Sequence, residues 1–145
     1  MIALLQRVGQ ARVEVSGELV GAIGQGLLLF VCAEPADTDA VADRLVAKVL
    51  KLRIFADAAG KMNLDLAAVE GAFLIVSQFT LAGSVAKGRR PSFDGAAPPG
   101  EAEPLVEALV NDLRGRGFRV ETGRFRAHME VALVNDGPVT LIVDF

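Results

Sequence analysis

The 145-residue sequence has no tryptophan and no tyrosine, and it contains only one cysteine and one histidine. A single cysteine, Cys32, excludes an internal disulfide and fits a reducing compartment. With one histidine beside it, the usual sets of zinc ligands cannot be assembled. We therefore expect a cytoplasmic protein without a metal site.

Long apolar runs are also missing. The longest uninterrupted one, residues 27–33, is far shorter than the roughly 20 residues that a membrane-spanning helix needs. The N-terminus lacks the leading positive charge and the cleavage site of a secretory signal. We expect no membrane span. The length and a hydrophobic content of 52% predict one domain, residues 1–145.

Positive charge is scarce, with 15 Lys and Arg against 18 Asp and Glu and a net charge of −3. This balance argues against a surface that binds nucleic acid broadly. The only stretch with net positive charge is residues 77–126. It holds a short basic cluster at Lys87, Arg89 and Arg90, and then five arginines within thirteen residues, from Arg114 to Arg126. These side chains form either a solvated surface or a local contact with phosphate groups.

Hydrophobic periodicity predicts two helices and about eight strands. The helices begin near Asp37 or Thr38 and near Glu101. Residues 27–33 and 72–76 are apolar throughout, which predicts strands buried on both faces. Further strands are expected at 2–8, 11–15, 118–122, 128–134 and 139–145, with a hairpin turn at Ser16-Gly17 and a tight turn at Asn135-Asp136-Gly137. Residues 82–100 predict a long loop of the kind that is often functional.

Two helices cannot cover both faces of so many strands. The sequence therefore predicts an α+β fold in which mixed β-sheets pack on each other and the two helices cover one side. A Rossmann fold is not expected.

Standard catalytic templates are absent. There is no nucleophile elbow, P-loop or zinc-protease motif, and a Ser-His-Asp triad would have to use His128, which lies in an alternating strand pattern. A polar group, Ser77-Gln78-Phe79-Thr80, follows a buried strand and precedes the long loop. It forms a site or merely satisfies backbone groups at the strand end. Gly137-Pro138 is an ordinary turn or a cis bond, found at about 5–6% of X–Pro bonds.

Three segments resemble the D-aminoacyl-tRNA deacylase family: 77–81 (SQFTL), 87–93 (KGRRPSF) and 135–140 (NDGPVT). Shorter matches occur at 6–8 (QRV) and 61–64 (KMNL), so the resemblance covers the whole length. It implies a three-layer β-β-α fold and a cytoplasmic homodimer that needs no cofactor. It also implies an enzyme that hydrolyses the ester between a D-amino acid and the terminal adenosine of tRNA, proofreading translation by chirality, and that acts on mischarged glycyl-tRNA(Ala).

The resemblance also implies roles for individual residues. Its catalytic positions are Ser77, Gln78 and Thr80. Lys87, Arg89 and Arg90 would contact tRNA phosphates. Gly137-Pro138, joined by a cis bond, would reach the active site of the partner subunit, with Arg7 bracing this loop. The substrate-binding positions are Phe79, Phe125, Met129, Gly137, Pro138 and Arg7. The chain departs from the family at Ala82, at 84–86, and at Arg126 and His128, positions that affect contacts with tRNA more than activity.

An aminoacyl ester is already labile, so its hydrolysis needs mainly positioning and stabilisation of the oxyanion. Thr80 acts either as nucleophile or water-positioning group, or it only shapes the pocket with Gln78 while the 2′-OH of the substrate assists an attacking water. The sequence offers no evident base for Thr80, which favours the second mechanism. Phe79 or Phe125 would stack on the terminal adenine. The alternative class is a dimer that binds RNA or a metabolite without catalysis.

Overall fold

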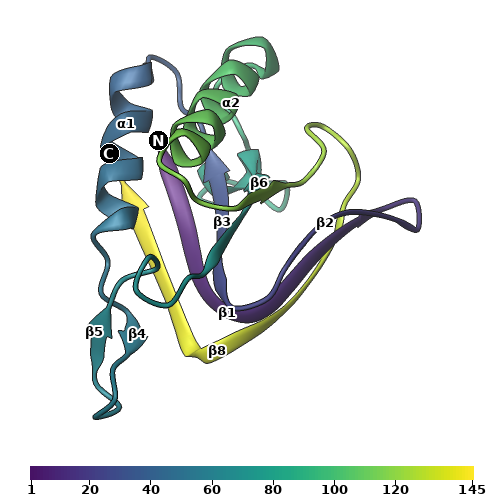
Figure 1. Ribbon diagram of the computed structural model, residues 1–145. Helices are drawn as coiled ribbons and strands as arrows, with labels where there is room; N and C mark the ends of the chain where they lie inside the picture. Colours follow the sequence, from purple (N-terminus) through teal and green to yellow (C-terminus); the bar gives the residue numbers. More distant parts are fainter.

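The computed structural model describes residues 1–145 and contains one bent sheet, one small two-stranded sheet and two α-helices (Figure 1). In chain order the elements are β1 (Ile2–Val15), β2 (Glu18–Ile23), β3 (Gly26–Cys32), α1 (Asp39–Leu50), β4 (Phe55–Ala56), β5 (Met62–Leu64), β6 (Ala72–Ser77), the 3₁₀-helix η1 (Phe79–Ala82), α2 (Pro99–Gly115), β7 (Val120–Thr122) and β8 (Glu130–Asp144). Neither α-helix has the length and apolar content that crossing a bilayer requires.

The main sheet follows the order β2-β1-β3-β6-β7, and β8 pairs with β1 along nearly all of its length. The pairs β3–β6 and β6–β7 are parallel, and all pairs that involve β1 are antiparallel. β1 and β8 bend together, so that the sheet folds over on itself (Figure 1). β2 and β7 stand at the two ends of this strand order. Arg119, just before β7, links them by donating from Nη2 to the carbonyl oxygen of Ala22 in β2 at 3.1 Å.

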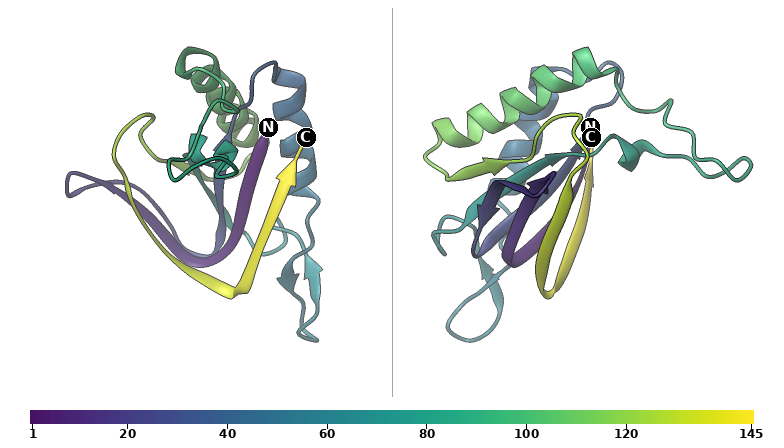
Figure 2. Two further views of the ribbon diagram at one scale, coloured as in Figure 1. Left: turned by 180° about the vertical axis from the view of Figure 1, so that it is seen from behind. Right: turned by 90° about the vertical axis from the view of Figure 1, so that its right-hand side faces the viewer.

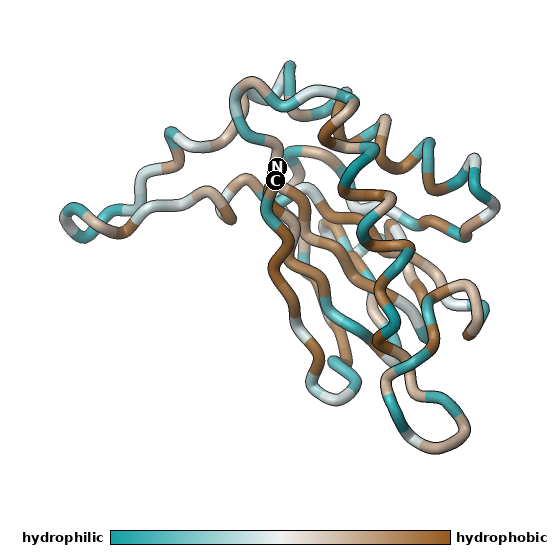
Figure 3. Tube along the Cα trace, turned by 90° about the vertical axis from the view of Figure 1, so that its left-hand side faces the viewer, coloured by the Kyte–Doolittle hydropathy of each residue, from teal (hydrophilic) through white to brown (hydrophobic).

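The folded sheet and the helices enclose two apolar cores. Because side chains alternate along a strand, Leu27 and Leu29 of β3 face the helices, whereas Leu28 faces the interior of the folded sheet. β6 alternates in the same way, with Phe73 and Leu74 on opposite sides. Both strands are buried on both faces, as their uninterrupted apolar runs predict. In Figure 3 brown, hydrophobic segments gather in the sheet, whereas the projecting loops are mainly teal and white. The expected α+β class is confirmed.

Both helices cover the same side of the sheet (Figures 1 and 2). The amphipathic pattern of α1 buries Leu45 and Val49, and Thr38 is its N-cap residue. α2 begins two residues before the predicted start at Glu101, and it buries Leu105 and Leu109. Its opposite face is polar and exposed.

The expected hairpin between strands 128–134 and 139–145 is wrong. Both segments belong to β8, and both pair with β1 instead of with each other. Between the pairs Gln6–Thr140 and Val8–Asn135, β8 advances five residues while β1 advances two, so residues 136–139 bulge out. The Oδ1 atom of Asn135 stabilises this bulge by accepting the N–H of Val139 at 2.7 Å. A long neighbouring strand thus outcompetes the local turn, and segments 2–8 and 11–15 likewise form one strand, β1.

Candidate active site

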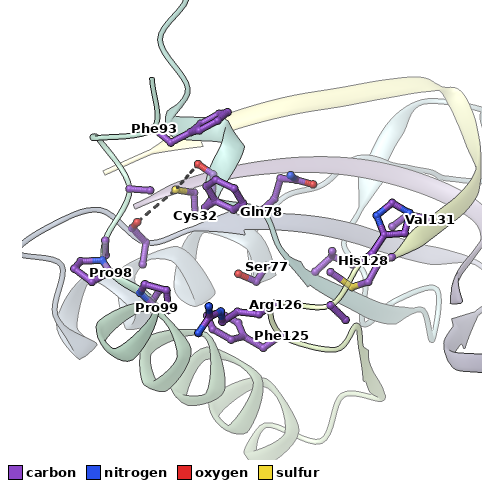
Figure 4. A pocket seen from close by; sticks show the side chains of 18 residues that line it. Cys32, Ser77, Gln78, Phe93, Pro98, Pro99, Phe125, Arg126, His128 and Val131 are labelled. Atoms are coloured by element: carbon purple, nitrogen blue, oxygen red, sulfur yellow. Dashed lines mark hydrogen bonds between the residues drawn. The ribbon is translucent and has the colours of Figure 1, made fainter. Parts of the chain in front are cut away.

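A cavity of about 640 Å³ opens where β3 and β6 end (Figure 4). These strands are parallel neighbours, so their carboxyl ends lie at the same edge of the sheet. The cavity is lined from four directions: by the end of β3, by the segment from β6 into η1, by the residues around the start of α2, and by the segment before β8. Predicted site residues among its lining are Ser77, Gln78, Phe79, Phe125 and Met129.

Thr80, the last residue of the polar group, lies in η1 and is not among the residues that line the cavity. Its hydroxyl oxygen accepts a hydrogen bond from Nε2 of Gln78 at 2.5 Å. The strand pairing of β6 continues as far as Gln78, whose N–H donates to the carbonyl of Val31 at 2.8 Å, and the chain then turns into η1. At the first turn of a helix the N–H groups have no intrahelical acceptor, and those of Phe79 and Thr80 have none elsewhere in the chain. Two backbone donors are therefore free beside the cavity.

Cys32 connects the end of β3 to η1. Its thiol donates to the carbonyl oxygens of Ala33 at 3.4 Å and Phe79 at 3.6 Å (Figure 4). Burial raises the pKa of the Cys32 thiol above its ordinary value, although a backbone hydrogen bond from Ala82 acts in the opposite direction. The neutral thiol is a weak nucleophile, and its contact with the Phe79 carbonyl links β3 to η1.

Aromatic and thioether side chains form the apolar walls. Phe79, which is 55% exposed, packs edge-to-face on Phe93 with ring centroids 5.1 Å apart. Met129 belongs to the lining from the segment before β8. Gly123 leaves the space that Met129 occupies, because a Cβ atom at Gly123 would lie 2.6 Å from the Met129 sulfur. These walls suit a planar heteroaromatic ring.

Arg7 and Gly137-Pro138 lie outside this cavity. Arg7 is buried, donates from Nε to the Asp136 carbonyl at 2.9 Å, and donates from Nη1 to the carbonyl of Ile54. It thereby supports the bulge of β8, where the Gly137–Pro138 bond is cis. Arg7 pairs with Leu27, whereas Cys32 at the cavity pairs with Ile2. Five residues along a strand correspond to about 16 Å, so Gly137-Pro138 does not line the cavity of its own chain.

The basic cluster lies on a loop that projects from the body of the protein (Figure 2). Ser84 and Ser92 close this loop by exchanging backbone hydrogen bonds of 2.8 and 2.9 Å. Lys87, Arg89 and Arg90 between them are exposed and form no ion pair with the chain. The second arginine run differs, because three of its members pair with carboxylates: Arg116 with Asp112, Arg119 with Glu121, and Arg124 with Glu18.

Comparison with known proteins identifies the family of this chain. The family model for D-Tyr-tRNA(Tyr) deacylase matches residues 4–144. The chain belongs to the D-Tyr-tRNA(Tyr) deacylase family. As a member of this deacylase family, it is a hydrolase.

Relatives in the deacylase family are similar over nearly their whole length. The D-aminoacyl-tRNA deacylase of Methylibium petroleiphilum is 60% identical over 141 residues, which cover 97% of this chain and 93% of the relative. That of Thermomicrobium roseum is 58% identical over 144 residues, covering 99% and 94%. A solved structure described as c-Myc DNA Unwinding Element Binding Protein has a TM-score of 0.93 at 37% identity, covering 100% of this chain and 99% of that one.

A second solved structure, described as a probable eukaryotic D-amino acid tRNA deacylase, has a TM-score of 0.86. It covers 99% of this chain and 98% of its own at 20% identity, and it supports the deacylase fold alone.

Several residues that line the cavity were not among the predicted site residues. His128 was expected in a strand, which is wrong, because β8 begins only at Glu130 and His128 lines the cavity from the preceding segment. Arg126 lines it as well, with a positive φ of 59°. Phe93, Pro98 and Pro99 also line the cavity. Phe93 belongs to segment 87–93, whose resemblance to the family could have indicated it, whereas no sequence feature indicated Pro98 or Pro99.

Proposed function

We propose that this protein hydrolyses the ester bond of D-aminoacyl-tRNA and releases a free D-amino acid and tRNA, as a proofreading step of translation in the cytoplasm. The observation that carries the proposal is the cavity at the ends of β3 and β6. Its lining includes Ser77, Gln78 and Phe79 together with Phe125 and Met129, which come from a part of the chain about fifty residues further on. Thr80 is linked to this lining by its hydrogen bond with Gln78. Membership of the deacylase family supports the same reaction.

The cavity fits the aminoacylated end of a tRNA. Its volume of about 640 Å³ lies within the range of about 300–1,000 Å³ that ligand pockets typically have. Phe79 or Phe125 provides a face on which the terminal adenine stacks, a contact worth roughly 1–3 kcal/mol. The ester at the ribose then lies toward Thr80 and the start of η1.

Water, and not Thr80, is the proposed nucleophile. The side-chain partner of Thr80 is the amide NH₂ of Gln78, which donates a hydrogen bond and cannot take up a proton. Thr80 therefore has no general base. In the proposed reaction the 2′-OH of the terminal ribose assists a water molecule that adds to the ester carbonyl. The bond to the ribose oxygen then breaks, and that oxygen takes the proton. The free N–H groups of Phe79 and Thr80 stabilise the oxyanion.

Selection of the D-substrate is assigned to the partner subunit of a homodimer. Because Gly137-Pro138 lies about 16 Å along the strands from the cavity of its own chain, it acts in the proposed dimer on the cavity of the partner. A rigid main-chain wall rejects the L-isomer by a steric clash while leaving the D-isomer untouched. Arg7 holds this wall in place from behind. Glycine has no side chain to clash, so glycyl-tRNA(Ala) is an additional substrate.

The loop that carries Lys87, Arg89 and Arg90 is the proposed contact for tRNA phosphates. Its cations are free of internal partners, unlike most of the second arginine run. In the proposed complex these unpaired cations contact phosphates beyond the cavity, where the acceptor stem would lie.

The test is turnover. A tRNA charged with a D-amino acid is incubated with the protein, and release of the free amino acid is followed against the spontaneous rate in buffer. Multiple turnovers above that rate are expected. A protein that binds the charged tRNA but leaves its ester intact would be a binding module, and the proposal would then be wrong.

A further inference from the structure

A second cavity, of about 510 Å³, lies beside the first one. It is bounded by α2 on one side and by residues 122–125 on the other, with Ile75 of β6 at its base. Ser77 and Phe125 line both cavities, so the two cavities adjoin at these residues. A chain that enters the first cavity with its terminal unit can therefore place its next unit in the second.

The wall formed by α2 carries both hydrogen-bond acceptors and donors. Glu103, Glu107, Asn111 and Arg114 follow one another at spacings of three to four residues, which places them on one face of the helix. No hydrogen bond or ion pair within the chain engages the side chains of Glu103, Glu107 or Asn111, and Arg114 donates only from Nη2, to the carbonyl of Val120 at 2.9 Å. On the same helix, by contrast, Asp112 is paired with Arg116.

The charges of this wall indicate what it can bind. Two unpaired carboxylates repel a phosphate group but accept hydrogen bonds from an amino group. The amide of Asn111 and the guanidinium of Arg114, four and seven residues beyond Glu107 on the same face, donate to ring nitrogen or carbonyl acceptors. A ligand that fits both carries an exocyclic amine next to acceptor atoms, and cytosine has this arrangement, with N4 as donor and N3 and O2 as acceptors.

We propose that the second cavity binds the base of the penultimate nucleotide of the tRNA, which is a cytidine in the CCA end. This inference rests on the proposed function, because the terminal adenosine must occupy the first cavity. Glu103 or Glu107 accepts from N4 of the cytosine, and Asn111 and Arg114 donate to its remaining acceptors. Uracil in the same place would turn its O4 acceptor toward the carboxylates, and would be disfavoured.

Short substrates isolate this contact from the rest of the tRNA. The dinucleotides CpA and UpA, each carrying the same D-aminoacyl ester on the terminal adenosine, have the same phosphate and differ only in the first base. We expect kcat/KM to be about fivefold higher for CpA, the lower end of what one base contact to a side chain provides at a partly exposed position.

The matched variants are Glu103→Gln/Glu107→Gln in the cavity wall and Glu101→Gln on the same helix outside it. An amide can donate to O4 of uracil as well as accept from cytosine, so the double variant should bring the CpA to UpA ratio close to one. Glu101→Gln should keep the wild-type ratio. All three residues are exposed on α2, and circular dichroism verifies that the variants are folded.

Equal rates for CpA and UpA in the wild type would overturn the inference, as would an unchanged ratio in the double variant. Failure of the proposed function gives a different result. In that case the wild type hydrolyses neither dinucleotide ester nor D-aminoacyl-tRNA above the rate in buffer.

Discussion

Replacing Arg7 by methionine tests whether this side chain supports the bulge that carries Gly137-Pro138. Arg7 is 9% exposed, and its guanidinium reaches the carbonyls of Asp136 and Ile54. Methionine retains an unbranched apolar stem in the same space but removes every donor. The variant therefore leaves two carbonyl groups without their partner while disturbing the packing little.

The expected loss of stability follows from these contacts. The hydrogen bond to Ile54 is buried, and a bond from a charged donor contributes about 1.5–3 kcal/mol. The bond to the Asp136 carbonyl is partly buried, so water replaces some of it. The ion pair with Asp136 Oδ2 at 3.4 Å adds about 0–1 kcal/mol, because that carboxylate is 54% exposed. Together we expect the free energy of unfolding to fall by about 2–4 kcal/mol.

Urea denaturation measures this change, and it is done at one fixed protein concentration because the proposed dimer would make the midpoint depend on concentration. Arg12→Met is the matched control. Arg12 lies on the same strand and pairs with Glu14 at 2.8 Å, but its side chain is 56% exposed, so a loss below about 1 kcal/mol is expected.

Activity provides a second readout for Arg7→Met. A loosened wall should lower the preference for D- over L-aminoacyl-tRNA or abolish activity. The reasoning is refuted if Arg7→Met unfolds like Arg12→Met and keeps the wild-type preference.

Three further variants test the cavity and the basic loop. Thr80→Ala should retain measurable deacylation, with a loss of about 10²–10³-fold at most, and a trapped acyl-threonine intermediate would restore Thr80 as nucleophile. Neutralising Lys87 and Arg89 together should weaken tRNA binding and reduce the salt slope by up to about 0.7–0.9 per phosphate contact, whereas an unchanged slope would leave them a solvated surface. Gly123→Ala should displace Met129 and raise KM for the charged tRNA, with little change in the melting temperature. An unchanged KM would contradict the role of Met129 as a cavity wall.

Local sequence patterns predicted the elements whose burial follows a regular pattern along the chain. β3 and β6 are apolar throughout because both of their faces are buried, and α1 shows its amphipathic spacing because one face is buried. β8 was mispredicted because Asn135-Asp136-Gly137 is a good turn sequence. The alternative, continued pairing with β1, depends on a strand more than 120 residues away.

Sequence patterns pointed to cavity residues where these are adjacent in the sequence, as with Ser77, Gln78 and Phe79. His128 was misplaced because its alternation with Glu130 extends a strand pattern past the true start of β8. The polar face of α2 shows why the second cavity was missed. Glu107 and Asn111 look like ordinary solvated positions until the fold places residues 122–125 opposite them.

The most direct test compares one tRNA charged with the D- and with the L-form of the same amino acid, under single-turnover conditions with enzyme in excess. Both substrates share every nucleotide and phosphate contact, so their ratio of rates isolates the configuration of one carbon atom. We expect rapid release of the D-amino acid, while the L-ester decays at its rate in buffer. Equal hydrolysis of both esters, or none of either, would contradict the proposed function.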